Sequence, residues 1–154
     1  MAPAAARKVT AKDAAKARRG GAPPAKESAA PAVPKPETIA AGLRAFFAIM
    51  AKWRVRNDDM AILLGRPSKS TLHNWKNGDV GAVAHGLDLA TRLSLVLGIF
   101  KALDELYADP AQADAWVRRP NTAFGGQSAL DRMLAGQITD LAAVRDYLNG
   151  VRAG

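Results

Sequence analysis

Apolar residues recur with helical spacing along almost all of the chain after residue 37. From Thr38 to about Trp53 they fall three and four positions apart, which predicts an amphipathic helix. From near Leu87 to Tyr107 spacings of four and three alternate, which predicts a longer helix. The expected inward residues are Ile39, Leu43, Phe46, Phe47 and Met50 in the first helix and Leu89, Leu93, Val96, Phe100, Leu103 and Tyr107 in the second. Since no segment has a convincing strand pattern, the predicted fold class is all-α.

The longer helix carries another apolar stripe, Leu95, Ile99 and Leu106, beside the first. Two adjacent stripes predict burial around more than half of the helix, as in a helix at the centre of a domain. A homodimer surface is the alternative interpretation. We favour the central helix, because it needs no partner chain to bury these residues.

Between the two predicted helices, residues 57–78 have the pattern of a helix-turn-helix. The first short helix has four apolar residues for packing, Met60, Ile62, Leu63 and Leu64. Gly65 suits a turn in which φ is positive. Ser68 suits the N-cap of the second helix. The pattern therefore predicts two short helices joined by a tight turn.

The second short helix is amphipathic in a way that suits DNA recognition. Leu72 and Trp75 share one side of a helical wheel, and the opposite side is polar. Asparagine can read an adenine edge, and lysines can reach phosphates. The candidate DNA-binding residues are Arg66, Lys69, Ser70, Thr71, His73, Asn74, Lys76 and Asn77. The alternative is an ordinary surface helix whose polar side is only solvated.

Charge distribution supports the DNA-binding interpretation. Residues 1–37 carry eight Lys and Arg against three acids, and residues 38–76 carry seven against two. Residues 77–154 carry seven against nine, so the positive charge gathers in the first half. A polyanion such as operator DNA is expected to prefer that half.

Composition excludes several function classes. The absence of cysteine excludes disulfides, a thiolate nucleophile and a cysteine-ligated zinc site, and suits a cytoplasmic protein. His73 and His85 lack metal-ligand spacing, and Gly125-Gly126 is no phosphate-binding loop. The apolar run from Leu93 to Phe100 is far shorter than the roughly 20 residues that span a bilayer. We therefore expect no enzyme activity, cofactor, metal site or membrane span.

Residues 1–37 form a separate segment with thirteen alanines, six prolines and almost no large apolar side chain. Such a composition predicts a disordered basic tail, because it cannot build a core. A mitochondrial transit peptide has a similar composition, but a flexible basic arm is the favoured interpretation. The arm is expected to add non-specific affinity for DNA.

Residues 115–154 contain a second group of motifs. Arg119-Pro120-Asn121 is predicted to end a short helix, and Phe124-Gly125-Gly126 to form a turn. Gln127 or Ser128 would begin another helix and Gly136 would stop it. A last helix is predicted from Asp140. Its inward residues would be Leu141, Val144 and Leu148, and its outward residues Arg145, Asn149 and Arg152.

Residues 38–154 resemble the Xre/MbcA/ParS group of antitoxins, the partners of RES-domain toxins. The matching residues in the W-x-x-R-P-N and F-G-G motifs are Trp116, Arg119, Pro120, Asn121, Phe124, Gly125 and Gly126. Those in the closing motif are Met133, Leu134, Gly136, Asp140, Leu141, Val144, Arg145, Tyr147 and Leu148. The segment from Leu93 to Leu103 is also similar. Two features depart from the family: Ala129 replaces a frequent proline, and the Gly65 to Trp75 interval is one residue longer than usual.

The resemblance implies a helix-turn-helix region with a long central helix (38–109) and a small helical toxin-binding domain (110–154). The toxin would be an enzyme that consumes NAD or transfers ADP-ribose from it, and the C-terminal domain would cover its active-site entrance. The candidate toxin-binding residues are Arg145, Asn149, Arg152 and Gly154. Trp116, Phe124 and Leu130 are expected in the core. The antitoxin, expected as a homodimer, would repress its own operon. A stand-alone repressor whose C-terminal domain only dimerises is the main alternative, and an enzyme is a distant third.

Overall fold

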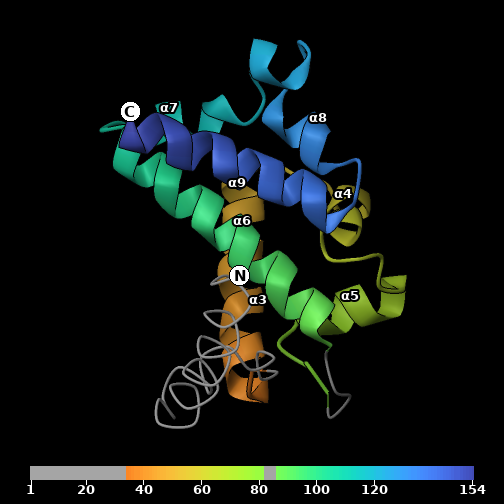
Figure 1. Cartoon of the computed structure of the whole chain (residues 1–154). Helices are drawn as coiled ribbons and strands as arrows, with labels where there is room; N and C mark the ends of the chain where they lie inside the picture. The colour runs from red at the N-terminus through yellow and green to blue at the C-terminus, as the bar shows by residue number, and fades with distance from the viewer. Residues whose placement is uncertain (1–33, 82–85) are drawn as a thin grey trace, which may run out of the picture. The chain divides into compact units, whose positions relative to one another are not determined.

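The computed structural model describes residues 34–81 and 86–154, and every element in these ranges is helical (Figure 1). The helices are α3 (Pro36–Trp53), α4 (Asn57–Leu63), α5 (Lys69–Lys76), α6 (Leu87–Leu106), α7 (Pro110–Trp116), the 3-10 helix η1 (Thr122–Phe124), α8 (Ala129–Met133) and α9 (Ile138–Ala153). An isolated bridge between Pro120 and Ser128 is the only β-type pairing in these ranges. The all-α prediction is confirmed. The prediction of a disordered tail falls mainly on residues 1–33, outside the described residues.

Helix α3 begins two residues before the predicted Thr38. Pro36 occupies the first turn, where its fixed φ suits a helix and its missing N–H is no loss, and Glu37 complements the positive end of the helix dipole. The helix ends where Arg54 adopts a left-handed conformation with φ of 58°. Of the predicted inward residues, Ile39, Leu43, Phe46 and Met50 are buried and Phe47 is half-buried. The predicted core side of α3 is therefore largely confirmed.

Helix α6 is the central element, as its two apolar stripes predicted. It packs against α3, α7 and α9 (Figure 1). Its buried apolar residues are Leu89, Leu93, Val96, Ile99, Ala102 and Leu103. Phe100, Leu95, Leu106 and Tyr107 are only half-buried, because they lie toward the edges of the packed surface. The helix stops at Leu106, since Tyr107 is already extended with φ of −118°.

Helices α6 and α9 run in the same direction. The Arg145 side chain lies against Gly98, and Arg152 pairs with Glu105. The second contact is seven residues, or about two helical turns, further along both helices. The segment between them, with α7, η1 and α8, returns the chain to the start of α6 so that α9 can lie parallel to it.

Helix α9 begins at Ile138, two residues before the predicted start at Asp140. The prediction was wrong because Gln137 is the N-cap and Asp140 is the third helical residue. Gln137 N–H donates to Asp140 Oδ2 at 3.0 Å, which completes a capping box. Leu141, Val144 and Leu148 are buried, as predicted.

The turns between α7 and α9 agree with most of the predicted helix ends and turns. Helix α7 ends at Trp116, three residues before the predicted Arg119-Pro120-Asn121 stop. The Asn121 side chain caps η1 by accepting from Ala123 N–H at 2.9 Å. Gly125 and Gly126 have positive φ, and Ser128 caps α8 through a capping box with Asp131. Helix α8 ends at Met133, before Gly136 (φ +96°), so this glycine forms the turn into α9.

Candidate functional site

The segment α4–turn–α5 has the geometry of a helix-turn-helix. Gly65 and Arg66 have φ of 90° and 65°, so two successive left-handed residues turn the chain after α4. Ser68 Oγ accepts from Thr71 N–H at 3.1 Å and thereby caps α5, as predicted. Leu72 is the buried residue of α5, and Trp75 is half-buried against the core. The predicted inward side of α5 is therefore confirmed.

Seven of the eight candidate DNA-binding residues are exposed, and Thr71 is half-buried. Ser68 Oγ donates to Thr71 Oγ1 at 2.8 Å, so the Thr71 hydroxyl contributes to the helix start. His73 Nε2 and Asn77 Nδ2 lie 3.0 Å apart, at hydrogen-bonding distance. Among the described residues, the Asn74 and Lys69 side chains have no hydrogen-bond or ion-pair partner. The structure thus places these residues on the accessible polar surface of α5 and of the turn before it.

A hollow of about 510 Å³ lies between α4 and α5. Its lining residues are Asn57, Asp58, Ala61, Pro67, Lys69, Leu72, His73, Lys76 and Asn77. Lys76 Nζ donates to Asn57 Oδ1 at 2.9 Å and links the end of α5 to the start of α4. Four of the lining residues are candidate DNA contacts, so the hollow is part of the same polar surface.

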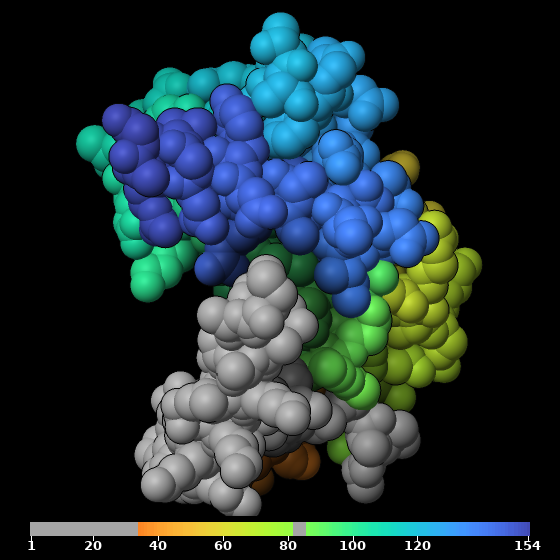
Figure 2. All heavy atoms as spheres, viewed as in Figure 1, coloured from red at the N-terminus to blue at the C-terminus, as the bar shows by residue number. Residues whose placement is uncertain are grey.

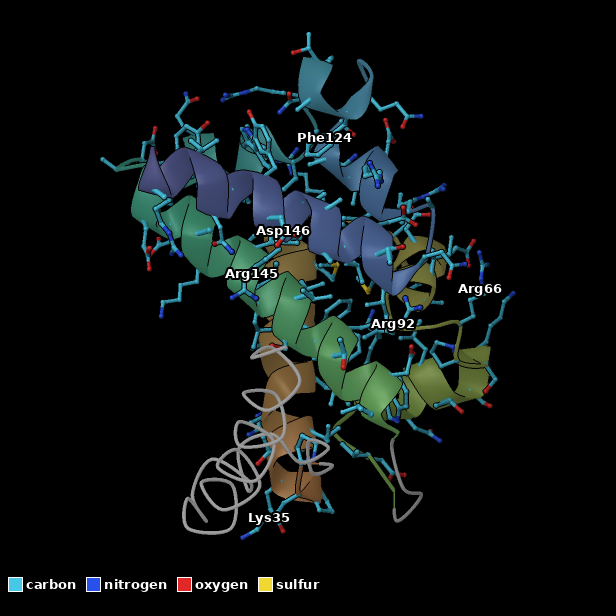
Figure 3. All side chains as sticks on the ribbon, viewed as in Figure 1. Lys35, Arg66, Arg92, Phe124, Arg145 and Asp146 are labelled. Atoms are coloured by element: carbon cyan, nitrogen blue, oxygen red, sulfur yellow. The ribbon has the colours of Figure 1, made fainter. Side chains whose placement is uncertain are left out.

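Arg92 of α6 holds the end of α4 in place, and sequence reasoning missed it. The residue is 7% exposed. Its Nη1 donates to the carbonyl oxygens of Leu63 and Ile62 at 3.3 and 3.4 Å, and its Nε pairs with Asp88 Oδ2 at 2.9 Å. These carbonyls belong to the last turn of α4, where, within the described residues, the Leu63 carbonyl has no backbone donor and the Ile62 carbonyl accepts only one backbone bond, from Gly65 N–H in the turn, at 3.2 Å. The sequence feature that could have identified Arg92 is an arginine among apolar helix positions with an aspartate four residues earlier. Figure 3 shows Arg92 between α6 and the α4–α5 segment.

A second arginine has the same role for α3. Arg118 Nε donates to the carbonyl oxygen of Trp53 at 3.1 Å, and its Nη2 donates to that of Arg54 at 2.7 Å. A cation at a helix C-terminus is favourable because it complements the negative end of the dipole. These hydrogen bonds therefore link the segment after α7 to the end of α3.

The turn between α8 and α9 packs on the helix-turn-helix. A Cβ atom at Gly136 would lie 3.4 Å from Ile62 Cγ2 and 3.5 Å from Arg66 Nη2. The glycine therefore allows a close approach of the α8–α9 turn. Arg66, a candidate DNA contact, lies in the turn between α4 and α5 rather than on α5 itself (Figure 3).

The candidate toxin-binding residues lie along α9, but they are not equally exposed. Arg152 and Gly154 are exposed, whereas Arg145 and Asn149 are half-buried. Arg152 donates to Glu105 of α6 and, through Nη2, to Asn149 Oδ1 at 3.1 Å. The structure therefore brings Asn149 and Arg152 together.

The expectation that Arg145 points away from the protein was wrong. Its guanidinium lies on α6 in the space that a Cβ of Gly98 would occupy (Figure 3). Glycine exposes the helix backbone at this position, so the planar group can rest on α6. Helical spacing alone does not reveal that the neighbouring helix has such a gap.

Three aromatic rings form a cluster on the C-terminal half. Trp116 and Tyr147 stack with centroids 6.1 Å apart and an interplanar angle of 16°. Phe124 meets Tyr147 edge to face at 5.3 Å and Trp116 at 6.5 Å. Trp116, Phe124 and Leu130 are all buried, as expected for the core of this region. The cluster fixes α7 and η1 against α9.

The described ranges hold no group of three or more metal-ligating His, Asp or Glu side chains. No helix in residues 34–81 and 86–154 combines the length and apolar character needed to span a bilayer. His85 lies outside the described residues.

The fold and its two surfaces define an all-α protein in which a helix-turn-helix and a C-terminal helical region pack in one compact unit. Residues 102–154 match the antitoxin Xre/MbcA/ParS C-terminal toxin-binding domain. The uncharacterized protein y4oB of Sinorhizobium fredii (strain NBRC 101917 / NGR234) is 45% identical over 116 residues, which are 75% of this chain and 88% of that protein. No solved structure matches the chain. The chain therefore belongs to the same family as the y4oB protein, and its residues 102–154 are similar to the toxin-binding domain of Xre/MbcA/ParS antitoxins.

Proposed function

We propose that the chain neutralises a RES-domain toxin through its C-terminal domain and represses its own operon through the helix-turn-helix. The proposed neutralisation of a toxin rests on the match of residues 102–154 to the toxin-binding domain. The toxin would be a NAD-consuming or ADP-ribosylating enzyme, and α9 would cover its active-site entrance. Asn149, Arg152 and Gly154 lie near the C-terminal end of α9, and Arg145 lies two turns earlier. Cationic and amide groups at this end suit a pocket that binds phosphates.

The DNA-binding half rests on the accessible polar side of α5. In a helix-turn-helix the second helix enters the major groove, where side chains of its exposed surface reach base edges. Asn74 and Lys69 are both exposed, so one is suited to a base edge and the other to a phosphate. A homodimer would read two half-sites of an operator. The proposed setting is the cytoplasm, with no cofactor and no catalytic residue in this chain.

Co-expression tests the toxin-binding half. The reading frame adjacent to this gene is expressed in a host whose growth it arrests, with and without this chain. We expect restored growth and a co-purifying complex. Loss of either result, with both proteins present in soluble extracts, removes the antitoxin proposal.

Gel-shift titration with the chain's own upstream DNA tests the repressor half. We expect a shifted band that survives excess non-specific DNA, and a chain with no preference for this fragment contradicts autorepression. A stand-alone repressor is the second candidate, favoured by the complete and accessible helix-turn-helix. It predicts DNA binding without rescue of growth.

A further inference from the structure

A groove of about 280 Å³ lies at the end of the molecule where α6, α7 and α9 meet. Its lining residues are Leu106, Tyr107, Trp116, Tyr147, Leu148 and Val151. All six are apolar or aromatic, so the groove lacks a charged lining group. Figure 2 shows the last turns of α9 at the surface beside the end of α6.

The groove has an exposed apolar rim. Val151 is 47% exposed, and within the described ranges only Leu87, at 43%, is another large apolar residue of this kind. Tyr107 and Tyr147 are half-buried, and neither hydroxyl has a hydrogen-bond partner among the described residues. Arg152 and Glu105 form a paired polar edge next to Val151. An apolar centre with aromatic walls and a polar margin is the composition of a protein-binding surface.

The volume of the groove indicates what kind of occupant fits. Sites for small-molecule ligands have volumes of roughly 300–1,000 Å³ and usually contain a few placed polar groups. This groove lies at the lower limit of that range and has no charged lining side chain, which suits one bulky side chain. The free tyrosine hydroxyls would then hydrogen-bond the backbone on either side of that side chain.

We propose that this groove receives a single large aliphatic or aromatic side chain from the surface of the toxin. The inference rests on the proposed function, and it adds an apolar anchor to the polar residues of α9. The toxin is the occupant rather than a second copy of this chain, because all six lining residues lie within the matched toxin-binding domain. Val151 and the two tyrosines would lose their contact with water in the complex.

The anchor is tested by changing Val151, which is exposed and contributes little to the core. Val151→Asp and Val151→Lys place opposite charges at the rim, and both should weaken binding of the purified product of the adjacent reading frame at least about tenfold, as for an interface residue of high energetic importance. Leu87→Asp is the matched control, because Leu87 is similarly exposed but lies outside residues 102–154. Binding is measured by calorimetry, with thermal unfolding of each variant as the folding check.

Each outcome decides one of the two proposals. If the unmodified chain does not bind the adjacent product, the proposed function fails and the anchor fails with it. If the unmodified chain binds but either Val151 variant binds equally well, or Leu87→Asp weakens binding as much, the anchor is overturned while the proposed function stands. Opposite effects of Asp and Lys would also overturn it, because they would indicate charge rather than apolar contact.

Fluorine NMR of 5-fluorotryptophan protein gives an independent readout. Trp116 lines the groove, Trp75 lies on α5 and Trp53 is buried in α3. Assignments come from Trp75→Phe and Trp116→Phe variants. The toxin should shift the Trp116 signal, and a complex that leaves this signal unchanged contradicts the proposal.

Discussion

Helices α5 and α9 lie in different regions of the molecule and present different kinds of surface. Helix α5 buries one residue, Leu72, and exposes cations and amides, of which Lys69 and Asn74 have no side-chain partner among the described residues. Helix α9 buries three residues, shares an aromatic cluster with α7 and η1, and pairs Arg152 with Glu105. Unpaired polar groups suit a hydrated polyanion, whereas apolar and aromatic groups suit a partner protein. The two regions should therefore respond differently to the same kind of substitution.

The largest contrast is expected between two tryptophans, one in each region. Trp116→Ala should lower the free energy of unfolding by about 3–5 kcal/mol, because it removes a buried ring that contacts Phe124 and Tyr147. Trp75→Ala should have a smaller effect, since Trp75 is only half-buried. Urea denaturation followed by circular dichroism measures both. An equal loss for the two variants would contradict the predicted difference between the buried and the half-buried ring.

The next contrast concerns two arginines, Arg92 and Arg132, that each link two helices. Arg92→Met should cost about 2–3 kcal/mol, because it leaves the buried carbonyl of Leu63 without a donor, while the Ile62 carbonyl keeps its bond from Gly65 N–H. The ion pair itself contributes little, since the Asp88 side chain is 57% exposed. Amide hydrogen exchange should accelerate in α4 and α5, DNA affinity should fall, and toxin affinity should be unchanged.

Arg132→Met is the matched control for Arg92→Met. Arg132 Nε pairs with Asp140 Oδ1 at 3.1 Å and joins α8 to α9. Its loss should accelerate exchange in α8 and the first turn of α9 and leave α4 unaffected. If both variants loosen the same helices, the arginines do not act locally.

The two regions also differ in what the sequence could predict. Periodicity identified the inward sides of α3, α6 and α9, because burial follows helical spacing when an apolar stripe is wide. The N-cap Ser68 was equally predictable, since an N-cap depends on residues within one helical turn.

Long-range contacts were not predictable in the same way. The contact between Arg145 and Gly98 depends on the direction in which α9 lies on α6, and Arg92 meets carbonyls about thirty residues away in the chain. A single sequence does not contain that geometry. Whether Asn74 or Arg152 contacts a partner is likewise a property of a complex, and these assignments stay predictions.

A smaller effect is expected for base-reading residues of α5. Asn74→Ala should weaken binding to the specific operator by about 1–3 kcal/mol and leave non-specific DNA affinity almost unchanged, because an amide reads base edges. Lys69→Ala should weaken both kinds of binding and reduce the salt slope by about one. Fluorescence anisotropy over a range of salt concentrations measures both. An Asn74→Ala variant that behaves like Lys69→Ala would mean that Asn74 contacts only the backbone of DNA.

The smallest effect is expected where α9 meets α6 at Gly98. A methyl group there would overlap the Arg145 guanidinium, so the guanidinium must move. It can do so because it is the far end of a flexible side chain. Alanine favours a helix over glycine by about 0.8–1 kcal/mol, and the lost contact of Arg145 offsets part of that gain. Gly98→Ala should therefore change the free energy of unfolding by less than about 1 kcal/mol.

Gly150→Ala gives the reference for Gly98→Ala, because nothing lies within 4 Å of a Cβ at Gly150. It should show the full helix preference, so the difference between the two variants measures the contact between Arg145 and α6. Equal stabilisation would mean that this contact contributes nothing in solution. A Gly98→Ala variant destabilised by several kcal/mol would instead mean that Arg145 is held rigidly on α6 and is not available to a toxin.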